Sequence, residues 1–299
     1  MKILKLAIIA LLVLPFAVRA QPTRVLTIVS EPDAYVWIDD VAYGKTGKDG
    51  KIRFRTFAVG THKLRVRAVG FKEVTRNLLP SQKGEIRVEL MKTTDEAELA
   101  FQKAEIETDK ERSVDLYKTA IRLRPAFPEA YIGLARQQAN LGDSEEALKS
   151  VRAARRLRPG YALASAVEGR ILKDASEFEK AIAAFKRSIT EGRGIQPEAH
   201  TGLGLLYKDR AESAAAEGDT DAEVANYLLA AGELRKAAQQ LSGAPDAIVI
   251  YQMLGDCYER ADKWSDAIKV YEEFLAIFPD ANEAEMFRSF IVQARKRIE

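Results

Sequence analysis

The chain has 299 residues, with 46 lysines and arginines, 44 aspartates and glutamates, one cysteine and two histidines. The near-balance of charge excludes the strong basic surplus of a nucleic-acid-binding chain, and a single cysteine excludes an internal disulfide. Two histidines leave little material for a histidine-rich metal site or a Ser-His-Asp arrangement, whereas the length is sufficient for two domains with separate cores.

Residues 1–20 have the pattern of a secretory signal peptide. Lys2 and Lys5 precede an apolar run at 6–16, and a short segment then ends at Ala20. This run lies well below the roughly 20 residues that span a bilayer, so we expect cleavage after Ala20, with a retained membrane anchor as the alternative. Because no cysteine lies near Ala20 to accept a lipid, the pattern predicts a periplasmic or extracellular protein that is not a lipoprotein.

Charge divides the rest of the chain into two units. Residues 21–92 carry 14 basic and 8 acidic side chains, a net charge of +6, whereas residues 93–299 carry 29 basic and 36 acidic side chains, a net charge of −7. This asymmetry between adjacent segments supports two domains.

Residues 21–92 have the two-residue period of β-strands. The segments that alternate, or that are rich in β-branched and aromatic residues, are 25–29, 35–38, 52–57, 64–68 and 85–90. Glycine, proline, aspartate and serine between them supply the backbone angles that turns need. Short strands with regular turns predict a small all-β sandwich.

A set of turn and strand motifs recurs in this region in a recognisable order. The motifs lie at 30–40 (SEPDAYVWIDD), 43–46, 59–62 and 70–71. Together they resemble a PEGA domain across residues 21–92, with Asp33 and Asp40 standing where the family usually has glycine. The resemblance implies a binding or spacing module of bacterial surface and periplasmic proteins, without established catalytic residues.

From residue 93 the hydrophobic period becomes that of helices, and the apolar residues change to alanine and leucine. The tetrapeptide Arg-Leu-Arg-Pro occurs at 122–125 and again at 156–159, a spacing of 34 residues. A fixed helical period of this length indicates a stacked repeat architecture. We expect five units over residues 93–281, beginning near Thr94, Pro128, Ala162, Pro197 and Ile248, and a polar capping helix at 282–299.

Small and aromatic residues stand at corresponding places in these units. They are clearest at Tyr251, Leu254, Gly255, Tyr258, Ala267, Tyr271 and Pro279, and at Tyr131, Leu134, Ala135, Ala147 and Pro159. These residues resemble tetratricopeptide repeats, which implies an all-α solenoid. Alanine or glycine lets paired helices approach, aromatic rings fill the groove between units, and proline ends each second helix. The chain is therefore expected to be multi-domain, an all-β sandwich followed by an all-α solenoid.

The fourth unit departs from the period. From Pro197 to Pro245 it exceeds one repeat by 14 residues, and the excess is rich in alanine. Good helix formers at 211–217 and 222–241 flank Gly218, so we expect longer paired helices there. The extension is either a tolerated insertion or an arm that contacts a partner or the β-domain.

One candidate site follows from the repeat period. Continuing it places four basic residues along the inner face of the solenoid, namely Arg136, Arg170, Lys173 and Lys208. We hypothesise that this strip binds an acidic peptide, because charge-assisted bonds to carboxylates are directional and the surrounding array is acidic. The alternative is a solvated polar face.

A second candidate site lies in the β-domain, where six basic residues share one strand parity. If the two segments pair as a hairpin, one sheet face carries Lys51, Arg53, Arg55, Lys63, Arg65 and Arg67. Such a face would bind an anion: a lipid headgroup, an acidic polymer, or the acidic solenoid itself, in which case it would be an interdomain clamp. The alternative is a solvated strand face.

No catalytic, metal-binding or cofactor-binding constellation is evident. Asp39 and Asp40 are expected next to each other on a strand, so their carboxylates point to opposite faces and cannot act as a catalytic pair. The glycine-rich segment 44–50 is not followed by a helix that could present its amides to a phosphate group. Cys257 has no histidine near it in sequence to generate a reactive thiolate. We expect a non-enzymatic envelope scaffold or adaptor that binds protein partners through its repeats and does not bind nucleic acid. The alternative is a glycan- or peptidoglycan-binding accessory protein using exposed aromatics, with Trp37 and Tyr43 as candidates, although Trp37 is expected in the core.

Overall fold

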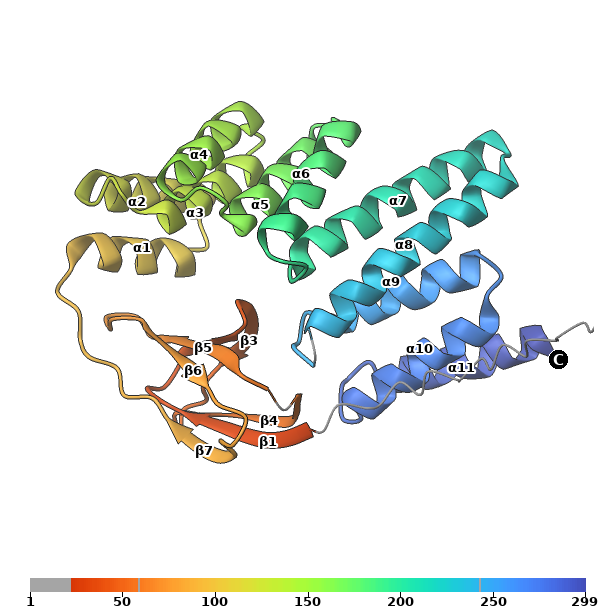
Figure 1. The fold of residues 1–299 in the computed structure, drawn as a ribbon, viewed down its shortest axis with the longest axis horizontal. Helices are drawn as coiled ribbons and strands as arrows, with labels where there is room; N and C mark the ends of the chain where they lie inside the picture. The colour runs from red at the N-terminus through yellow and green to blue at the C-terminus, as the bar shows by residue number, and fades with distance from the viewer. Residues whose placement is uncertain (1–22, 59, 242) are drawn as a thin grey trace, which may run out of the picture.

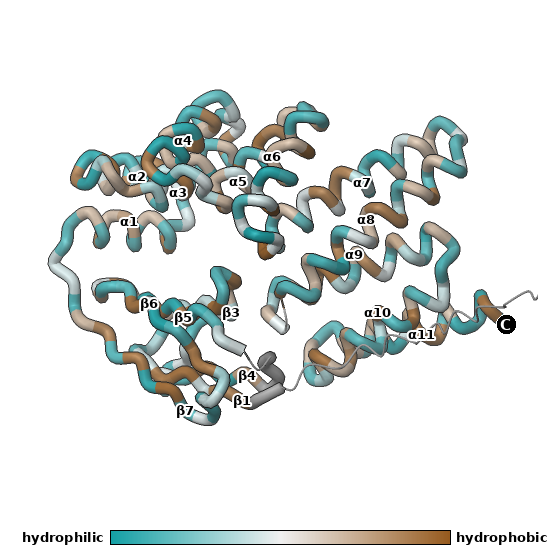
Figure 2. The backbone as a smooth tube through the Cα atoms, in the orientation of Figure 1, coloured by the Kyte–Doolittle hydropathy of each residue, from teal (hydrophilic) through white to brown (hydrophobic). Residues whose placement is uncertain are grey.

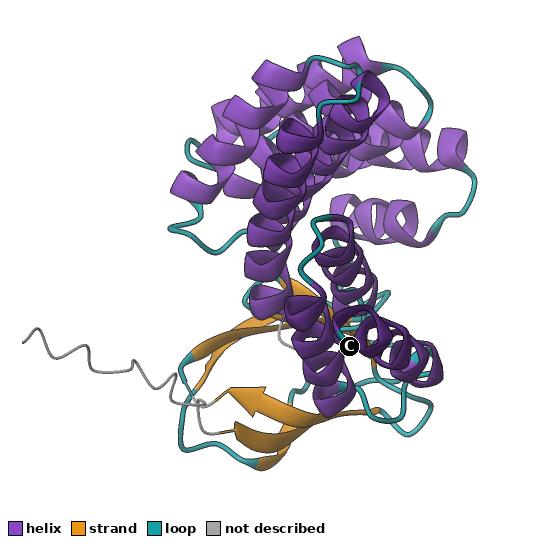
Figure 3. Ribbon diagram, turned by 90° about the vertical axis from the view of Figure 1, so that its right-hand side faces the viewer, coloured by secondary structure: helices purple, strands orange, loops and turns teal. Residues whose placement is uncertain are grey.

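The computed structural model describes residues 23–58, 60–241 and 243–299, so the predicted signal peptide at 1–20 lies outside the described residues. A β-unit (residues 23–92) is followed by a helical array (residues 93–299). The array curves, and the β-unit lies in the opening of the curve (Figures 1 and 3). None of the helices in the described part of the chain is long and apolar enough to cross a bilayer.

The β-unit consists of two sheets. One has the strand order β4-β1-β7 and the other the order β3-β2-β5-β6. In the first, β1 is antiparallel to β4 and parallel to β7, and all pairs in the second are antiparallel. The strands are β1 (Thr23–Val29), β2 (Tyr35–Ile38), β3 (Val41–Lys45), β4 (Lys51–Ala58), β5 (His62–Arg67), β6 (Val74–Leu78) and β7 (Gly84–Arg87).

The core of the β-unit follows the two-residue alternation along its strands. Leu26 and Ile28 of β1 and Val36 of β2 are fully buried, as is Val66 of β5, and all four belong to one hydrophobic cluster. Since the inward residues of both sheets share this core, the predicted two-layer arrangement is confirmed.

The predicted hairpin between the two basic segments is wrong. β4 pairs with β1, whereas β5 pairs with β2 and β6 in the other sheet. Lys51, Arg53 and Arg55 therefore share no sheet with Lys63, Arg65 and Arg67. Alternation specifies which face of a strand is buried, not which strand lies beside it, and this is why the pairing could not be read from the pattern.

In the described residues the array forms five helix pairs and a closing helix, and helices begin at Pro128, Ala162 and Pro197. Hydrophobic and hydrophilic residues alternate along each helix (Figure 2). The helices are α1 (Glu96–Ile106), α2 (Lys110–Leu123), α3 (Pro128–Asn140), α4 (Ser144–Leu157), α5 (Ala162–Asp174), α6 (Phe178–Glu191), α7 (Pro197–Glu217), α8 (Thr220–Leu241), α9 (Ala247–Arg260), α10 (Trp264–Ile277) and α11 (Ala284–Ile298).

The fourth unit is an elongated pair of helices. The helix α7 has 21 residues and α8 has 22. Gly218 ends α7 in the left-handed region with φ 77°, and the Asp219 carboxylate accepts a hydrogen bond from Ala222 N at 3.0 Å. The tip of this pair points away from the β-unit, and its base lies beside β3 (Figure 1).

Glycines in the first helix of a unit allow an aromatic ring to fill the space between helices. A Cβ atom on Gly255 would overlap the Tyr271 ring, and one on Gly133 would overlap the Tyr117 ring. At the end of the array, the Phe287 ring of α11 stacks on the Phe274 ring of α10 with centroids 3.7 Å apart. The closing helix therefore completes the last core.

Candidate binding cleft between the β-unit and the array

A cleft of about 980 Å³ lies between the β-unit and the inner side of the array. Its β wall is the outer face of the sheet that contains β2 and β5, and its helical wall comes from α1, α3, α5, α7 and the start of α9. In a repeat array these first helices of each unit line the concave surface, so the β-unit covers that surface and converts it into a cleft.

The β wall carries Trp37 between two arginines. Trp37 lies between the buried Val36 and Ile38, so its side chain faces outward from the sandwich, into the cleft. The guanidinium carbons of Arg65 and Arg67 lie 4.5 and 4.9 Å from the centroid of the indole ring. Both distances are within the range of cation–π attraction.

The expected positions of the two candidate aromatics are therefore reversed. Trp37, expected in the core, lines the cleft. Tyr43, the other candidate for an exposed aromatic, is only 8% exposed and packs edge-on against Phe54. The alternation along each strand explains both positions. Trp37 lies between the buried Val36 and Ile38 and so faces the other side of the sheet, whereas Tyr43 faces the same side as the buried Val41.

Arg67 joins the β-unit to α1. Its guanidinium lies 2.5 Å from Glu105 Oε2 and 3.5 Å from Glu73 Oε2, and 5.0 Å from the centroid of the Phe101 ring. Burial raises the pKa of Glu105 and of Glu73, and the charge of Arg67 opposes that rise. One of the six basic residues predicted as an anion-binding face thus forms an ion pair with the acidic array.

Gln102 of α1 makes a second connection, which the sequence did not reveal. Its side-chain nitrogen donates to Phe71 O and its side-chain oxygen accepts from Gly70 N, both at 2.8 Å. The residue is 2% exposed. A glutamine in a helix gives no sequence signal of this kind, because its partners are backbone groups of a loop about 30 residues away.

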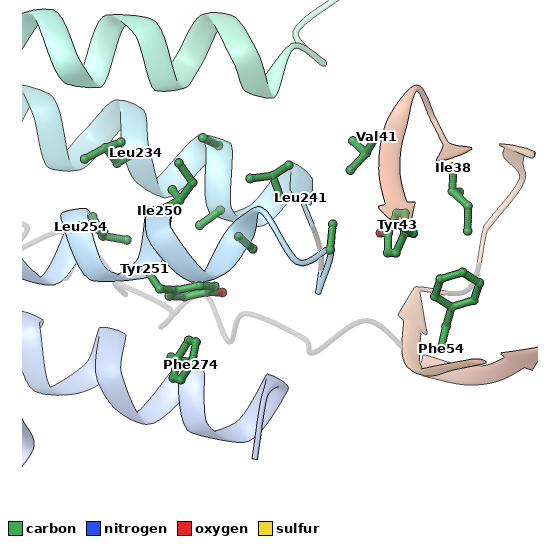
Figure 4. Packing of buried hydrophobic residues seen from close by; sticks show 14 of the residues in the cluster. Ile38, Val41, Tyr43, Phe54, Leu234, Leu241, Ile250, Tyr251, Leu254 and Phe274 are labelled. Carbon is green, nitrogen blue, oxygen red and sulfur yellow. The ribbon is translucent and has the colours of Figure 1, made fainter. Parts of the chain in front are cut away.

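The opposite edge of the β-unit meets the base of the fourth unit. Val41 of β3 and Leu241 of α8 point toward one another and belong to one hydrophobic cluster (Figure 4). The β-unit therefore contacts the array at α1 and at the end of α8, with the cleft between these contacts.

Three of the four basic residues predicted on the inner face line the cleft, namely Arg136, Arg170 and Lys173. Arg136 of α3 lies 2.5 Å from Glu198 of α7, and Lys173 lies 3.1 Å from Asp174. Arg170 of α5 forms no ion pair with any described residue. Arg136 and Arg170 are one repeat apart, and this is why they lie on the same helical wall of the cleft.

Lys208 does not join them. It forms an ion pair with Glu212, one turn further along α7, and lies outside the lining of the cleft. The hydrogen bond with Glu212 raises the pKa of Lys208, with smaller contributions from Asp256 and Tyr227. These neighbours belong to α9 and α8, so this part of α7 faces the end of the array.

Lys51 and Arg53 of β4 and Lys63 of β5 also lie outside the cleft lining. Lys51 lies 2.5 Å from Glu85, Lys63 lies 3.2 Å from Asp40, and Arg53 is exposed. The side chain of Arg55 is outside the described residues. Among the five predicted positions whose side chains the structure describes, Arg65 and Arg67 line the cleft.

The pKa of Tyr161 is affected by charged residues from both walls of the cleft. Burial raises its pKa to about 12, with Glu129 adding to the rise, whereas Arg158, Arg65 and Arg136 lower it. Arg65 belongs to β5 and Arg136 to α3, so both walls lie within electrostatic reach of a single hydroxyl group.

The remaining titratable groups with chemical interest have local partners. His62 Nδ1 lies 2.6 Å from Asp39, and His200 Nδ1 lies 2.6 Å from Glu233. Cys257 is buried, and burial raises the pKa of its thiol to about 12. In the part of the chain that the structure describes, no three His, Cys, Asp or Glu side chains are placed to hold a metal ion.

Comparison with known proteins identifies one repeat. A family model described as tetratricopeptide repeat matches residues 116–149, from α2 to α4. No curated protein sequence matches the chain. The chain therefore contains a tetratricopeptide repeat, and repeats of this type are typical of protein–protein interaction scaffolds, which are generally non-catalytic.

Several solved structures are similar to the chain. The crystal structure of MamA is 22% identical with a TM-score of 0.40, covering 59% of this chain and 92% of that one. The thermophilic TPR protein TTC0263 of Thermus thermophilus is 20% identical with a TM-score of 0.43, covering 61% and 91%. The APC/C hetero-tetramer Cut9-Hcn1 is 16% identical with a TM-score of 0.40, covering 67% and 43%.

Proposed function

We propose that this protein is a non-enzymatic scaffold or adaptor that binds a segment of a protein partner in the cleft. The observation that carries the proposal is the cleft itself, lined by the first helices of successive repeats, where Arg136 and Arg170 stand at equivalent positions. Repeats of this type present their concave side to partners. The occupant is a polypeptide that carries carboxylates, since Arg170 and Lys173 offer cationic donors on that wall.

The site of action is the bacterial cell envelope, in the periplasm or outside the cell. The supporting observations are the signal-like pattern of residues 1–20 and the resemblance of residues 21–92 to a PEGA domain. In this setting the β-unit is a spacing and binding module attached to the array, and neither a cofactor nor nucleic acid is involved.

Photo-crosslinking tests the proposed function. A benzophenone amino acid at Gln137, which lines the cleft, should crosslink a partner in envelope extracts, whereas one at the exposed Lys118 of α2 should not. Arg170→Glu should abolish the crosslink, because a negative charge repels an acidic segment. Lys208→Glu is the matched control outside the cleft. Equal crosslinking at Gln137 in the wild type and in Arg170→Glu would reject the acidic partner.

One observation favours a second function, the recognition of a glycan or another anionic envelope component. Trp37 lines the cleft beside Arg65, and a sugar could contact the part of its ring that the arginines leave uncovered. The chain has two tryptophans, so Trp264→Phe leaves Trp37 as the sole reporter. A saturable change in its fluorescence on titration with peptidoglycan fragments would support this function, and an unchanged spectrum would count against it.

A further inference from the structure

Three buried guanidinium nitrogens in the cleft have no hydrogen-bond partner among the described residues. They are Arg65 Nε, Arg136 Nε and Arg170 Nη2, from β5, α3 and α5. Arg76 Nε shares this property but lies outside the cleft lining. A buried donor without a partner is costly, and three arginines of one cleft that carry such a donor indicate that this cleft is short of acceptors.

The carboxylates of the cleft are largely engaged elsewhere and leave two of these arginines without a counter-ion. Glu105 and Glu73 pair with Arg67, and Glu198 pairs with Arg136. Within the described residues, neither Arg65 nor Arg170 has a carboxylate oxygen within ion-pair distance.

The arginine of the β wall is held in place without an ion pair. Arg65 stacks on Trp37, which keeps its planar group at the surface of the cleft. Stacking on a ring restricts the side chain while leaving its N–H donors available, and a planar guanidinium suits two-pronged binding of a carboxylate. The β-unit therefore presents a positioned donor opposite the array.

We propose that the binding site is composite, with Arg65 of the β-unit and Arg170 of the array binding carboxylates of one extended acidic polypeptide segment that lies between the two walls. This inference rests on the proposed function and adds that the β-unit supplies half of the site. Arg136 adds positive charge to the array wall while it remains paired with Glu198.

The lining of the cleft favours a polypeptide over other anions. Apolar side chains from successive helices stand between the charges, including Ile132, Leu163, Leu205 and Val249. A peptide in which acidic and apolar residues alternate satisfies both kinds of surface, whereas inorganic phosphate and an acidic sugar polymer have no apolar side chains to bury.

The test is fluorescence anisotropy on the full chain with a labelled peptide of alternating glutamate and alanine. The same peptide with glutamine in place of glutamate is the ligand control. Arg65→Gln and Arg170→Gln should each weaken binding at least about tenfold, because each removes a charged hydrogen bond. Arg53→Gln, an exposed arginine on the other sheet, is the protein control and should leave the affinity unchanged.

Each outcome decides the proposal. Weakening by both substitutions supports the composite site. Weakening by Arg170→Gln alone overturns it while leaving the array-based function intact, and no binding of the glutamate peptide to the wild type overturns the acidic occupant. Stronger competition by oligogalacturonate or phosphate than by unlabelled peptide assigns the site to another anion. If Arg65→Gln lowers the melting temperature, Arg65→Lys provides the second variant, and a loss of affinity with unchanged melting supports the proposal.

Discussion

Gln102 is a buried amide whose two hydrogen bonds hold the loop at Gly70 and Phe71 against α1. Replacing it with alanine leaves one backbone N–H and one backbone carbonyl without their partner, and each such loss costs about 1–3 kcal/mol. We expect Gln102→Ala to lower the free energy of unfolding by about 2 kcal/mol or more in urea titrations. Gln293→Ala, at an exposed position of α11, should change it little. Equal effects of the two substitutions would show that the loop contact contributes nothing.

Two helical glycines give opposite predictions. At Gly255 an added Cβ would meet the Tyr271 ring, whereas at Gly232 of α8 nothing lies within 4 Å. Gly232→Ala should raise stability by about 0.5–1 kcal/mol through helix propensity, and Gly255→Ala should lower it by about 1–3 kcal/mol through overpacking. Thermal unfolding of both variants measures the difference. A stabilising Gly255→Ala would mean that Tyr271 moves at little cost.

Single elements were predictable from the sequence to different degrees. The helices follow from a 34-residue period and from prolines at Pro128 and Pro197, where proline occupies the first turn. Strand β3 is absent from the strands that the sequence predicts, because Gly44 lies within it and the sharp reversal occurs just before it. There Asp39 and Asp40 both have positive φ, 51° and 65°, which is the backbone of a two-residue hairpin turn.

The sequence did not show which strands are neighbours, and the predicted six-residue basic face was wrong for this reason. The alternation of β4 and β5 correctly indicated which residues face inward, such as Phe54 and Leu64. The pattern contains no information on whether β4 continues into the same sheet or crosses to the other one. Trp37 was expected in the core and lines the cleft instead, because its neighbours Val36 and Ile38 both face inward and successive strand residues face opposite sides.

The closing helix α11 is expected to be required for a stable array. Phe287 is fully buried and stacks on Phe274, and Tyr271 packs against it with ring centroids 5.5 Å apart. Truncation after residue 281 exposes this aromatic cluster, and terminal repeats need a polar cap. The truncated protein should melt at a lower temperature and aggregate more readily. Melting at the same temperature as the full chain would show that the last repeat is complete without α11.

At the scale of the whole molecule, the contact between Arg67 and Glu105 predicts a dependence on pH. Burial raises the pKa of Glu105 above its usual value of 4.5. A carboxyl group with a raised pKa in the folded state binds more protons when folded, so its contribution is greatest at low pH and is lost as pH rises above that value. Glu105→Gln removes this titration.

The variant should therefore gain in melting temperature relative to the wild type as the pH rises above 4.5, the usual pKa of a glutamate. Glu111→Gln, at an exposed position of α2, is the matched control and should run parallel to the wild type. A constant difference between Glu105→Gln and the wild type over this range would contradict a buried, titrating Glu105. Since Glu105 lies on α1 and Arg67 on β5, this measurement reports on the contact between the units.

The cleft as a whole could not be predicted, because no local pattern relates the β-unit to the array. Arg136 and Arg170 were found through their shared repeat position, but their partner wall with Trp37 and Arg65 depends on how two separately folded units meet. Such an arrangement follows from contacts between residues far apart in sequence, which periodicity does not encode.

The contact between Val41 and Leu241 has a consequence for the order in which the molecule assembles. These residues are 200 positions apart, so the loop that joins them closes only after the fourth unit exists, although its entropic cost grows slowly with length. If the chain folds as it emerges from its N-terminus, the β-unit and the first three repeats form before the contact between Val41 and Leu241 can be made. During that interval the cleft is open on the side that the contact between Val41 and Leu241 later closes.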